Sequence, residues 1–392
     1  MSKPIYLDNQ STTPLDPKVF ESMLPFFNEK FGNASSIHHI YGLECRDAVE
    51  KARSVLAESI HADSREIIFT SGATEAINLA IKGIVGENNQ KCHIITQATE
   101  HNAVLDTCKA IEHKGWSVTI LPVDSTGMVD PKLIMDTIND QTALISIMHA
   151  NNEIGSIQHI NKIGKICKDN NILFFVDACQ SFGKLEIDVN KMNINLLAAT
   201  AHKIYGPKGI GLLYVSRKNP KVTLEMQIDG GGHERGFRSG TLSVPLIIGF
   251  AKAVEICLES RASENNYLEK LRNRLFEGIK DEHSDIIVNG NLKRRLTHNL
   301  NLCFPDLDAE TIIMKMKGIA CSTGSACSSM NLEPSHVIKA LGHSNELAHS
   351  AIRFSLGRFN TYQEIDQSII EINKILNDLK VKKFERKNKL HQ

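Results

Sequence analysis

The sequence predicts an α/β fold, with a large domain built on a mostly parallel sheet and a smaller α+β domain towards the C-terminus. Two observations support this prediction. Between about residues 65 and 215, short apolar runs alternate with helical patterns, which is the order of elements in a parallel sheet. The runs are almost continuously apolar, so other elements must cover both faces of the expected sheet.

The expected elements follow from these patterns in order. A first strand lies at residues 5–8, and the large domain has strands at 67–70, 93–96, 144–148, 172–176 and 196–199, with helices around 76–81, 101–113 and 160–168. A long helix runs from Leu246 to beyond Leu275 and bridges the two domains. Strands at 297–304 and 351–355 and a helix near 362–379 complete the smaller domain. The basic tail at 380–389 is expected to be a solvated, frayed end, or else a surface for an acidic partner.

The composition excludes several classes of protein. Hydrophobic residues make up 42% and charged residues 23% of the 392 residues, which is typical of a globular protein. The 45 basic and 45 acidic residues cancel, which argues against a general nucleic-acid or membrane-surface binder. No apolar run reaches the roughly 20 residues of a membrane span, and the N-terminus shows no apolar signal core. The nine cysteines are scattered and form no CxxC pair, so we expect free thiols in the cytoplasm.

One cysteine has unusual neighbours. Cys327 lies in the segment Ser322-Thr323-Gly324-Ser325-Ala326-Cys327-Ser328-Ser329, where the flanking residues are small and most carry a hydroxyl. A cysteine kept for packing usually has large apolar neighbours, because free cysteine behaves as a small hydrophobe. The segment therefore predicts a loop that presents a thiol.

A second signal lies where the expected strands end. Lys203 follows the run at 196–199 and precedes a glycine-rich turn; taken alone, it could be an ordinary surface lysine. Other polar residues follow neighbouring strands, namely Ser71 to Thr74, His101, Asn151 to Glu153, Asp177 and Gln180. Since ligands of parallel sheets bind at the carboxyl ends of the strands, we expect these residues to form one site.

These residues have matching chemical roles if the ligand is pyridoxal 5'-phosphate (PLP). The Lys203 amine can form a Schiff base with the aldehyde of PLP, and the Asp177 carboxylate can keep the ring nitrogen protonated. Gln180 can donate a hydrogen bond to the ring hydroxyl. His101 can stack on the ring and move protons, because its pKa lies near physiological pH.

The phosphate of the same cofactor would lie at the start of a helix. The helix that begins near Ala73 and Thr74 has free N–H groups there, and the Thr74 hydroxyl adds a donor. Thr200 and His202 can bind the same phosphate. Together with the ring-binding residues, they predict a PLP site.

Several long motifs occur in one order between Ile5 and about Phe359. They are Thr70-Ser71-Gly72-Ala73-Thr74-Glu75, Thr99-Glu100-His101, Asn151-Asn152-Glu153-Ile154-Gly155, His202-Lys203-Ile204-Tyr205-Gly206-Pro207-Lys208-Gly209, Gly230-Gly231-Gly232-His233-Glu234-Arg235-Gly236, Arg238-Ser239-Gly240-Thr241, Cys327 in its loop, and Ala351-Ile352-Arg353-Phe354-Ser355. In these motifs the chain resembles the cysteine desulfurases of the IscS/NifS type, within the class V aminotransferase family of fold-type I PLP enzymes. The resemblance implies a large PLP-binding domain at residues 15–260, with a seven-stranded sheet, and a small domain made of residues 1–14 and 261–392.

The resemblance also implies a role for each matching residue. Lys203 would be the Schiff-base lysine, and the residues in contact with the cofactor would be Ala73, Thr74, His101, Asn152, Asp177, Gln180, Thr200, Ala201 and His202. Thr241 would reach the phosphate bound in the other subunit, which implies a homodimer. Arg353 would pair with the substrate carboxylate, with Asn33 and Asn152 beside it.

The implied reaction converts L-cysteine to L-alanine. Lys203 would remove the α-proton, His101 would take part in later proton shifts, and the Cys327 thiolate would attack the substrate sulfur and keep it as a persulfide. Implied acceptors are an iron–sulfur scaffold protein or a tRNA thiolation system. No intrinsic metal is implied, although Cys327 could ligate a [2Fe–2S] cluster transiently with a scaffold partner. A selenocysteine lyase or another PLP β-lyase remains an alternative, as does a non-catalytic sulfur-carrier scaffold.

Some positions depart from the family pattern. Thr200-Ala201 stands where many relatives have Ser-Gly, and Cys179 and Cys321 stand where residues without a thiol are common. We interpret Cys179 as an inert small side chain. The C-terminus lacks the tryptophan-containing extension that is associated with docking of the scaffold protein, so the partner is in doubt.

Overall fold

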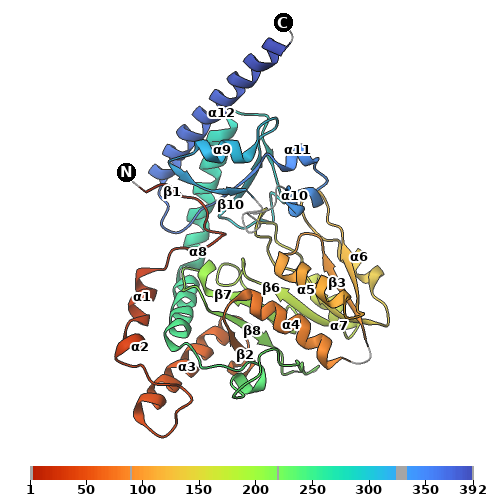
Figure 1. Cartoon of the computed structure of the whole chain (residues 1–392), viewed down its shortest axis with the longest axis vertical. Coiled ribbons are helices and arrows are strands. Elements are labelled where there is room, and N and C mark those ends of the chain that lie inside the picture. Colours follow the sequence, from red (N-terminus) through yellow and green to blue (C-terminus); the bar gives the residue numbers. More distant parts are fainter. Residues whose placement is uncertain (1–2, 89–90, 219, 324–332, 391–392) are drawn as a thin grey trace.

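The computed structural model describes residues 3–88, 91–218, 220–323 and 333–390 (Figure 1). Cys327 and its immediate neighbours therefore lie outside the described residues. None of the described helices combines the length and the apolar character that a membrane span requires.

A seven-stranded sheet forms the centre of the described structure, in the order β2-β8-β7-β6-β5-β3-β4. Its strands are β2 (Ile67–Thr70), β3 (His93–Gln97), β4 (Ser117–Leu121), β5 (Thr142–Ser146), β6 (Leu173–Asp177), β7 (Leu196–Thr200) and β8 (Gly211–Val215). Strand β8 is antiparallel to both of its neighbours, and the other pairs are parallel. The predicted mostly parallel sheet is confirmed.

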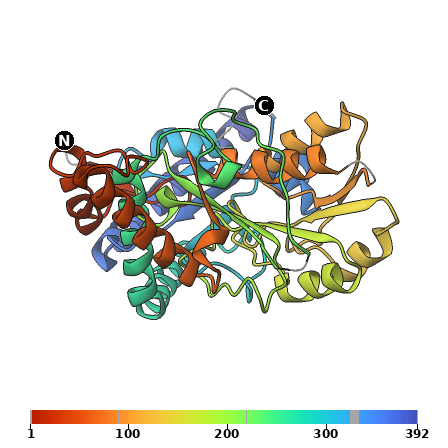
Figure 2. The same cartoon turned by 90° about the horizontal axis from the view of Figure 1, so that it is seen from below.

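Both faces of this sheet are buried, as the apolar runs predicted. In β2, Ile67 and Phe69 pack into one hydrophobic cluster, whereas Ile68 packs into another on the opposite face. Figure 2 shows the sheet between two helical layers, with α4 and α5 on one side and α7 on the other. The helices of this part are α1 (Pro17–Met23), α2 (Pro25–Asn28), α3 (Ile40–Glu58), α4 (Ala73–Glu87), α5 (Asn102–Glu112), α6 (Pro131–Thr137) and α7 (Ile160–Asp169).

Two details of the sheet differ from the sequence prediction. Strand β5 ends at Ser146, two residues before the end of the apolar run. Ile147 and Met148 are buried but do not continue the strand. Strands β4 and β8 were not predicted. The half-exposed pattern of β4 marks it as an edge strand, whose sequence is less uniformly apolar than that of a central strand.

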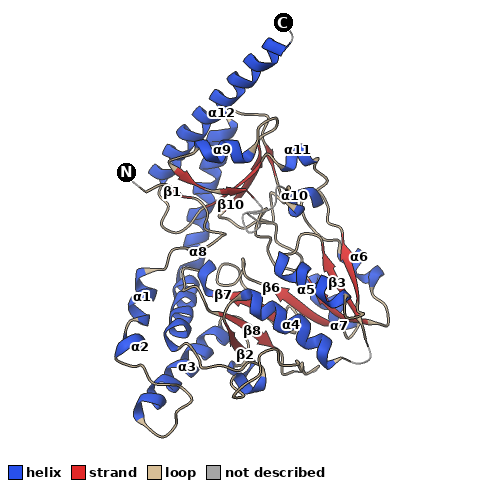
Figure 3. Cartoon of the chain, in the orientation of Figure 1, coloured by secondary structure: helices blue, strands red, loops and turns tan. Residues whose placement is uncertain are grey.

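A second core lies around a four-stranded antiparallel sheet in the order β12-β13-β10-β9 (Figure 3). Its strands are β9 (Ile287–Val288), β10 (Asn299–Cys303), β12 (Ser322–Thr323) and β13 (Ala351–Ser355), and β1 (Ile5–Tyr6) pairs with β11 (Ile319–Ala320) beside it. The helices of this part are α8 (Val244–Lys280), α9 (Ala309–Lys315), α10 (His336–Ala340), α11 (Asn345–Ala348) and α12 (Tyr362–Leu390).

Helix α8 joins the two cores, as its predicted length indicated. Its first half, from Val244 to Cys257, packs with the central sheet, and its second half, from Leu268 to Ile279, packs with the C-terminal sheet. The N-terminal Leu7 also lies in the C-terminal core. Leu7 and the second half of α8 thus belong to the C-terminal core, and the expected boundaries of the smaller domain, residues 1–14 and 261–392, stay a prediction.

The prediction of a frayed tail after residue 379 was wrong, because α12 continues to Leu390. No proline or glycine interrupts residues 362–390, so nothing in the backbone chemistry ends the helix earlier. Figure 1 shows α12 extending away from the rest of the molecule.

Candidate active site

A cavity of about 540 Å³ lies at the carboxyl edge of the central sheet. It is lined by nearly all of the residues that sequence analysis assigned to one site: Ala73, Thr74, His101, Asn152, Asp177, Gln180, Thr200, His202, Lys203 and Arg353. The expectation that the strand ends converge is therefore confirmed. Ala201, which follows Thr200, is fully buried and is not among the residues lining the cavity.

Lys203 reaches the cavity because β7 ends at Thr200 and a short 3-10 helix, Ala201–Lys203, follows it. The Lys203 Nζ donates hydrogen bonds to the carbonyl oxygens of Gln10, at 2.5 Å, and Ser11, at 2.6 Å. The lysine amine is therefore held by the N-terminal segment of the chain.

Asp177 ends β6 and is only 5% exposed. One of its oxygens, Oδ1, accepts a hydrogen bond from the Cys179 backbone N–H at 2.9 Å, which fixes the carboxylate at the strand end. Burial and then the charge of Asp177 raise the pKa of the Cys179 thiol well above its usual range. Cys179 thus stays a neutral thiol, which supports its interpretation as an inert side chain.

Two histidines, His101 and His202, line the cavity. The Nδ1 of His101 accepts a hydrogen bond from the Ala103 backbone N–H at 3.0 Å, so a neutral His101 carries its proton on Nε2. Burial and then the charge of Lys203 lower the pKa of His202 to about 4. His202 is therefore neutral at physiological pH, and its Nδ1 lies 3.1 Å from the Thr12 hydroxyl.

The phosphate end of the predicted site is the start of α4. The N-cap residue of this 15-residue helix is Gly72, which has no side chain to accept hydrogen bonds from the N–H groups of the first turn. A Cβ placed on Gly72 would meet only open space, which leaves room for a ligand there. The carboxylate of Glu75 bonds instead to Ser71 N, at 2.8 Å, and to Arg238 Nε, at 2.8 Å. Thr200 also lines the cavity, and its hydroxyl donates a hydrogen bond to Ile210 O at 3.1 Å. To donate to a phosphate, the hydroxyl would have to rotate away from this carbonyl oxygen.

Arg353 lies at the other end of the cavity, on β13. Its NH1 donates to the Asn152 carbonyl oxygen at 2.7 Å, and its NH2 donates to Asp8 Oδ1, Ser11 Oγ and Ser322 Oγ at 2.8, 2.6 and 2.8 Å. The side chain is 4% exposed. The guanidinium is thus fixed at the cavity wall, where a planar cation can bind a carboxylate.

Buried polar atoms in this region suit a polar ligand. Among the described residues, Gln10 Nε2, Asn152 Oδ1, Gln180 Oε1 and Arg353 Nε have no hydrogen-bond partner. Buried polar atoms without a partner are costly, and a bound ligand or water satisfies them. Gln180 donates its Nε2 to Gln10 O at 3.0 Å. Its Oε1 and the second N–H of Nε2 remain for a ligand, so the predicted donation to the ring hydroxyl stays a prediction.

Besides Ala201, two predicted site residues, Asn33 and Thr241, do not line the cavity of this chain. Asn33 is exposed, and its Oδ1 accepts a hydrogen bond from Ser35 N at 2.9 Å. Thr241 is also exposed. Within one chain, the structure brings neither residue to the other members of the site.

Sequence reasoning missed the N-terminal segment of the site. Gln10, Ser11 and Thr12 line the cavity, as do Glu75 and Lys208. The only available signal was the polar run that follows the first strand, from Asp8 to Thr13. Such a run is also typical of an ordinary surface loop, so it did not point to the site.

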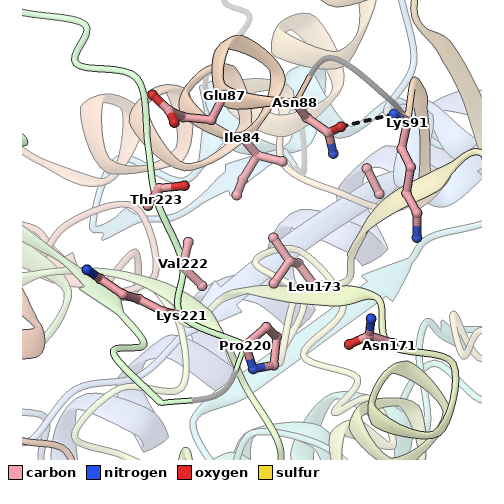
Figure 4. Close-up of a pocket in the computed structure, with 11 residues that line it drawn as sticks. Ile84, Glu87, Asn88, Lys91, Asn171, Leu173, Pro220, Lys221, Val222 and Thr223 are labelled. Carbon is pink, nitrogen blue, oxygen red and sulfur yellow. Dashed lines mark hydrogen bonds between the residues drawn. The ribbon is translucent and has the colours of Figure 1, made fainter.

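A second cavity, of about 280 Å³, lies at the opposite edge of the sheet (Figure 4). It is lined by Leu173, the first residue of β6, and by residues at the end of α4, including Ile84 and Glu87. Of the described residues around it, none belongs to the predicted site. Ligands of parallel sheets bind at the carboxyl edge, so the larger cavity is the candidate active site.

Comparison with known proteins agrees with this geometry. The family model for aminotransferase class-V matches residues 5–367. The chain belongs to the class-V aminotransferase family. As a member of that family it is similar to a protein named cysteine desulfurase IscS from Rickettsia prowazekii, with 50% identity over 370 residues, 94% of this chain and 90% of the relative.

Solved structures give the same result for this member of the class-V aminotransferase family. A structure described as a NifS-like protein has a TM-score of 0.89 and 37% identity, covering 95% of this chain and 99% of its own. Another, described as SspA in complex with cysteine, has a TM-score of 0.81 and 38% identity, covering 91% of this chain and 100% of its own. The predicted fold class and family are confirmed.

Proposed function

We propose that this chain is a PLP-dependent cysteine desulfurase that converts L-cysteine to L-alanine and leaves the sulfur on Cys327 as a persulfide. One observation carries the proposal: Lys203, Asp177 and Arg353 line a single cavity at the carboxyl edge of the sheet. A lysine amine, a carboxylate and a guanidinium are the groups that a PLP enzyme acting on an amino acid requires. The relatives named cysteine desulfurase, and the similar structure that contains cysteine, support this choice of substrate.

The cofactor would be held by residues at both ends of the cavity. The start of α4 and the Thr74 hydroxyl would bind the phosphate, and Asp177 would face the ring nitrogen. When bound, PLP supplies an aromatic ring that accepts the electrons released from the substrate α-carbon. Arg353 and Asn152 would hold the substrate carboxylate at the other end.

The protein's own residues would then move protons and sulfur. Lys203 Nζ would take the α-proton, and His101, with its proton on Nε2, would return protons to the product. The Cys327 thiolate would attack the substrate sulfur: an S–S bond forms, the Cβ–S bond breaks, and its electron pair stays with Cβ. Protonation at Cβ and return of a proton to Cα complete alanine, so one sulfur atom is transferred without an added oxidant or reductant.

Two experiments test this function. Purified protein loaded with PLP should release alanine from L-cysteine, and Lys203→Ala should abolish this release. Cys327→Ser should lower turnover by at least about a hundredfold, because a serine hydroxyl is a far weaker nucleophile than a thiolate. A selenocysteine lyase or another β-lyase would keep full turnover in Cys327→Ser, whereas a non-catalytic carrier would release no alanine even as the wild-type protein.

Cys321 provides the matched control for the nucleophile. Burial and then the charge of Asp8 raise the pKa of the Cys321 thiol to about 12, so it stays protonated at physiological pH. Cys321→Ala should therefore keep turnover within about threefold of the wild-type protein. Equal losses in the two cysteine variants would contradict the assignment of Cys327.

We also propose that the enzyme is a homodimer. A continuous stretch of sequence carries large exposed apolar side chains, which we term the N-terminal apolar surface: Phe20, Leu24, Phe27, Phe31, Ile37, Ile40, Tyr41 and Leu43. Exposed apolar side chains gathered in this way usually mark an interface. Figure 1 shows α1, α2 and α3 together at the lower edge of the molecule. A second copy on this surface would account for the exposure of Asn33 and Thr241, which would then complete the neighbouring site.

The sulfur acceptor and the cellular location are parts of the same proposal. An iron–sulfur scaffold protein is the first candidate acceptor, and a tRNA thiolation system is the second. Transfer of labelled sulfur from the persulfide to each purified acceptor separates the two. A cytoplasmic location agrees with the state of the eight described cysteines, which are all free thiols.

A further inference from the structure

The segment Asp8 to Thr12, which we term the N-terminal strap, contacts most of the groups that are central to the proposed reaction. It links β1, in the C-terminal part, to the residues before α1 (Figure 1). Three of its residues, Gln10, Ser11 and Thr12, line the active-site cavity. Their contacts with Lys203, Gln180, His202 and Arg353 span 170 to 342 positions of sequence.

The strap holds the Lys203 amine through main-chain atoms. The carbonyl oxygens of Gln10 and Ser11 accept hydrogen bonds from Lys203 Nζ at 2.5 and 2.6 Å. A neutral amine has two N–H donors and one lone pair. With both donors directed at carbonyl oxygens, the lone pair has a fixed direction.

The strap is itself held by hydrogen bonds from the smaller core. The Tyr6 hydroxyl donates to Thr12 O at 2.8 Å, and Gln10 N donates to Ser355 Oγ at 2.9 Å. Asn9 Nδ2 donates to Ser355 O at 3.0 Å. Burial and then the charge of Asp8 raise the pKa of Tyr6 to about 12, so the phenol remains a donor. The two carbonyl oxygens thus occupy fixed positions.

We propose that the Gln10 and Ser11 carbonyl oxygens are the receptor for the Lys203 amine whenever it is not bonded to the cofactor, and that the N-terminal strap positions this amine as the base. The inference rests on the proposed function, because it assumes that Lys203 carries the cofactor. During proton transfer the α-proton moves to Nζ, and the resulting ammonium keeps both carbonyl acceptors. Hydrogen bonds to a charged donor are stronger than those to a neutral one, so the strap favours the protonated product of this step.

The strap also connects the base to substrate recognition. Ser11 Oγ accepts a hydrogen bond from Arg353 NH2 at 2.6 Å, and the Ser11 carbonyl oxygen accepts one from Lys203 Nζ. One residue therefore touches both the guanidinium that would bind the substrate carboxylate and the amine that would take the α-proton. The distance between these two groups is set by a single short segment of backbone.

A measurement on Lys203 itself tests the receptor. In full-length protein freed of cofactor, the acetylation rate of each lysine is followed by peptide mass spectrometry. The double variant Tyr6→Phe, Ser355→Ala removes two anchors of the strap. Lys203 should then be acetylated about tenfold faster, because the positioned carbonyl oxygens favour the ammonium form, which has no lone pair for the reaction. Lys184, a half-buried lysine whose Nζ contacts His298 at 3.3 Å, serves as the internal reference.

The control is the double variant Tyr267→Phe, Ser350→Ala, which also removes one tyrosine and one serine hydroxyl, but outside the strap. The Tyr267 hydroxyl donates to Asn360 O at 2.8 Å, and Ser350 Oγ donates to Leu347 O at 2.8 Å. This variant should leave the Lys203 rate unchanged. The proposed role of the two carbonyl oxygens is overturned if the strap variant and the control give the same Lys203 acetylation rate. It is also overturned if the acetylation rates of Lys184 and Lys203 rise equally, which would indicate general loosening of the structure.

A second readout follows the base in the loaded protein. Exchange of the α-proton of L-alanine with deuterated solvent needs Lys203 and does not need Cys327. In the strap variant the maximal exchange rate should fall about tenfold while the concentration of alanine at half-saturation stays within about threefold. An unchanged maximal rate would overturn the proposal. If the wild-type protein itself takes up no PLP, the proposed function fails, whatever the strap variant shows.

Discussion

Arg353 NH2 lies 2.8 Å from Asp8 Oδ1, so the arginine proposed to bind the substrate carboxylate already holds a carboxylate of its own chain. The pair is enclosed, with the two side chains 4% and 18% exposed. Asp8 Oδ1 also accepts hydrogen bonds from Ser11 Oγ and Ser322 Oγ, at 2.8 and 2.9 Å. Asp8 therefore orients Arg353 through an acceptor atom and, at the same time, opposes an incoming anion through its charge.

Replacing Asp8 separates these two effects. Asp8→Asn keeps an acceptor oxygen but removes the charge, so cysteine should bind about three- to tenfold more tightly. Asp8→Ala removes the acceptor as well and should weaken binding. Dissociation constants are read from the absorbance change of bound cofactor on titration with cysteine in the Cys327→Ser background. If Asp8→Asn weakens binding as much as Asp8→Ala, the charge of Asp8 does not oppose the substrate.

Glu100 predicts a dependence of stability on pH. Its Oε1 accepts hydrogen bonds from Met148 N, at 2.6 Å, and Gln97 Nε2, at 3.0 Å. Burial raises the pKa of Glu100 to about 8; the Asp177 charge adds to the shift, and the Met148 N–H opposes it. The folded protein then binds one more proton than the unfolded chain between the two pKa values. This contribution to stability is complete below about pH 4.5 and is lost as the pH rises towards 8.

The variant Glu100→Gln keeps the accepting oxygen and cannot titrate. Relative to the wild-type protein, its free energy of unfolding should increase by roughly 1 kcal/mol per pH unit between about pH 6 and 8. Denaturant unfolding at several pH values measures the difference. If the free energies of unfolding of the two proteins change with pH in parallel, Glu100 is ionised in the folded state at neutral pH.

Glu234 anchors a turn that precedes Thr241 in the sequence. Its carboxylate binds Arg53 through two hydrogen bonds, at 2.7 and 2.8 Å, and accepts a third from Phe69 N at 2.7 Å. Glu234 and Arg235 both have positive φ angles, of 49° and 59°, which non-glycine residues rarely adopt. The buried ion pair holds the turn in this conformation.

Glu234→Gln leaves Arg53 buried with a weaker partner and should lower the free energy of unfolding by about 3 kcal/mol. Because Thr241 lies a few residues after the turn, the retention of PLP on dilution should fall as well. Glu255→Gln, in the half-exposed pair with Lys252, is the control and should change stability by no more than about 0.5 kcal/mol. Equal stability of the two variants would contradict the anchoring role.

The N-terminal apolar surface predicts an assembly that a single charge disrupts. Phe31 is 64% exposed and stacks on Tyr41, so Phe31→Asp should shift the protein from dimer to monomer in sedimentation experiments. Met314 is 77% exposed on α9, away from this surface, and Met314→Asp should leave the dimer intact. A dimer that survives in both variants would place the interface elsewhere.

Much of the fold and of the site could be predicted from the sequence, for a definite physical reason. Buried parallel strands need apolar runs, and residues that follow such runs must meet at one edge of the sheet. That rule places Ser71 to Thr74, His101, Asn152, Asp177 and Lys203 at one edge of the sheet, where they line one cavity. The residue types then indicated PLP, since an amine, a carboxylate and helix N–H groups suit its aldehyde, ring nitrogen and phosphate.

What only the tertiary structure decided is how these groups are held. The carbonyl oxygens of Gln10 and Ser11 contact Lys203 across 193 and 192 positions, and Asp8 contacts Arg353 across 345. Every residue has a carbonyl oxygen, so no residue type marks the two that receive the lysine. The orientation of Gln180 and the occupied hydrogen bonds of Arg353 depend likewise on partners brought close by folding. The sequence by itself determined that the groups at the strand ends meet at one site, and the packing of distant segments added the N-terminal strap and decided which hydrogen bonds remain for a ligand.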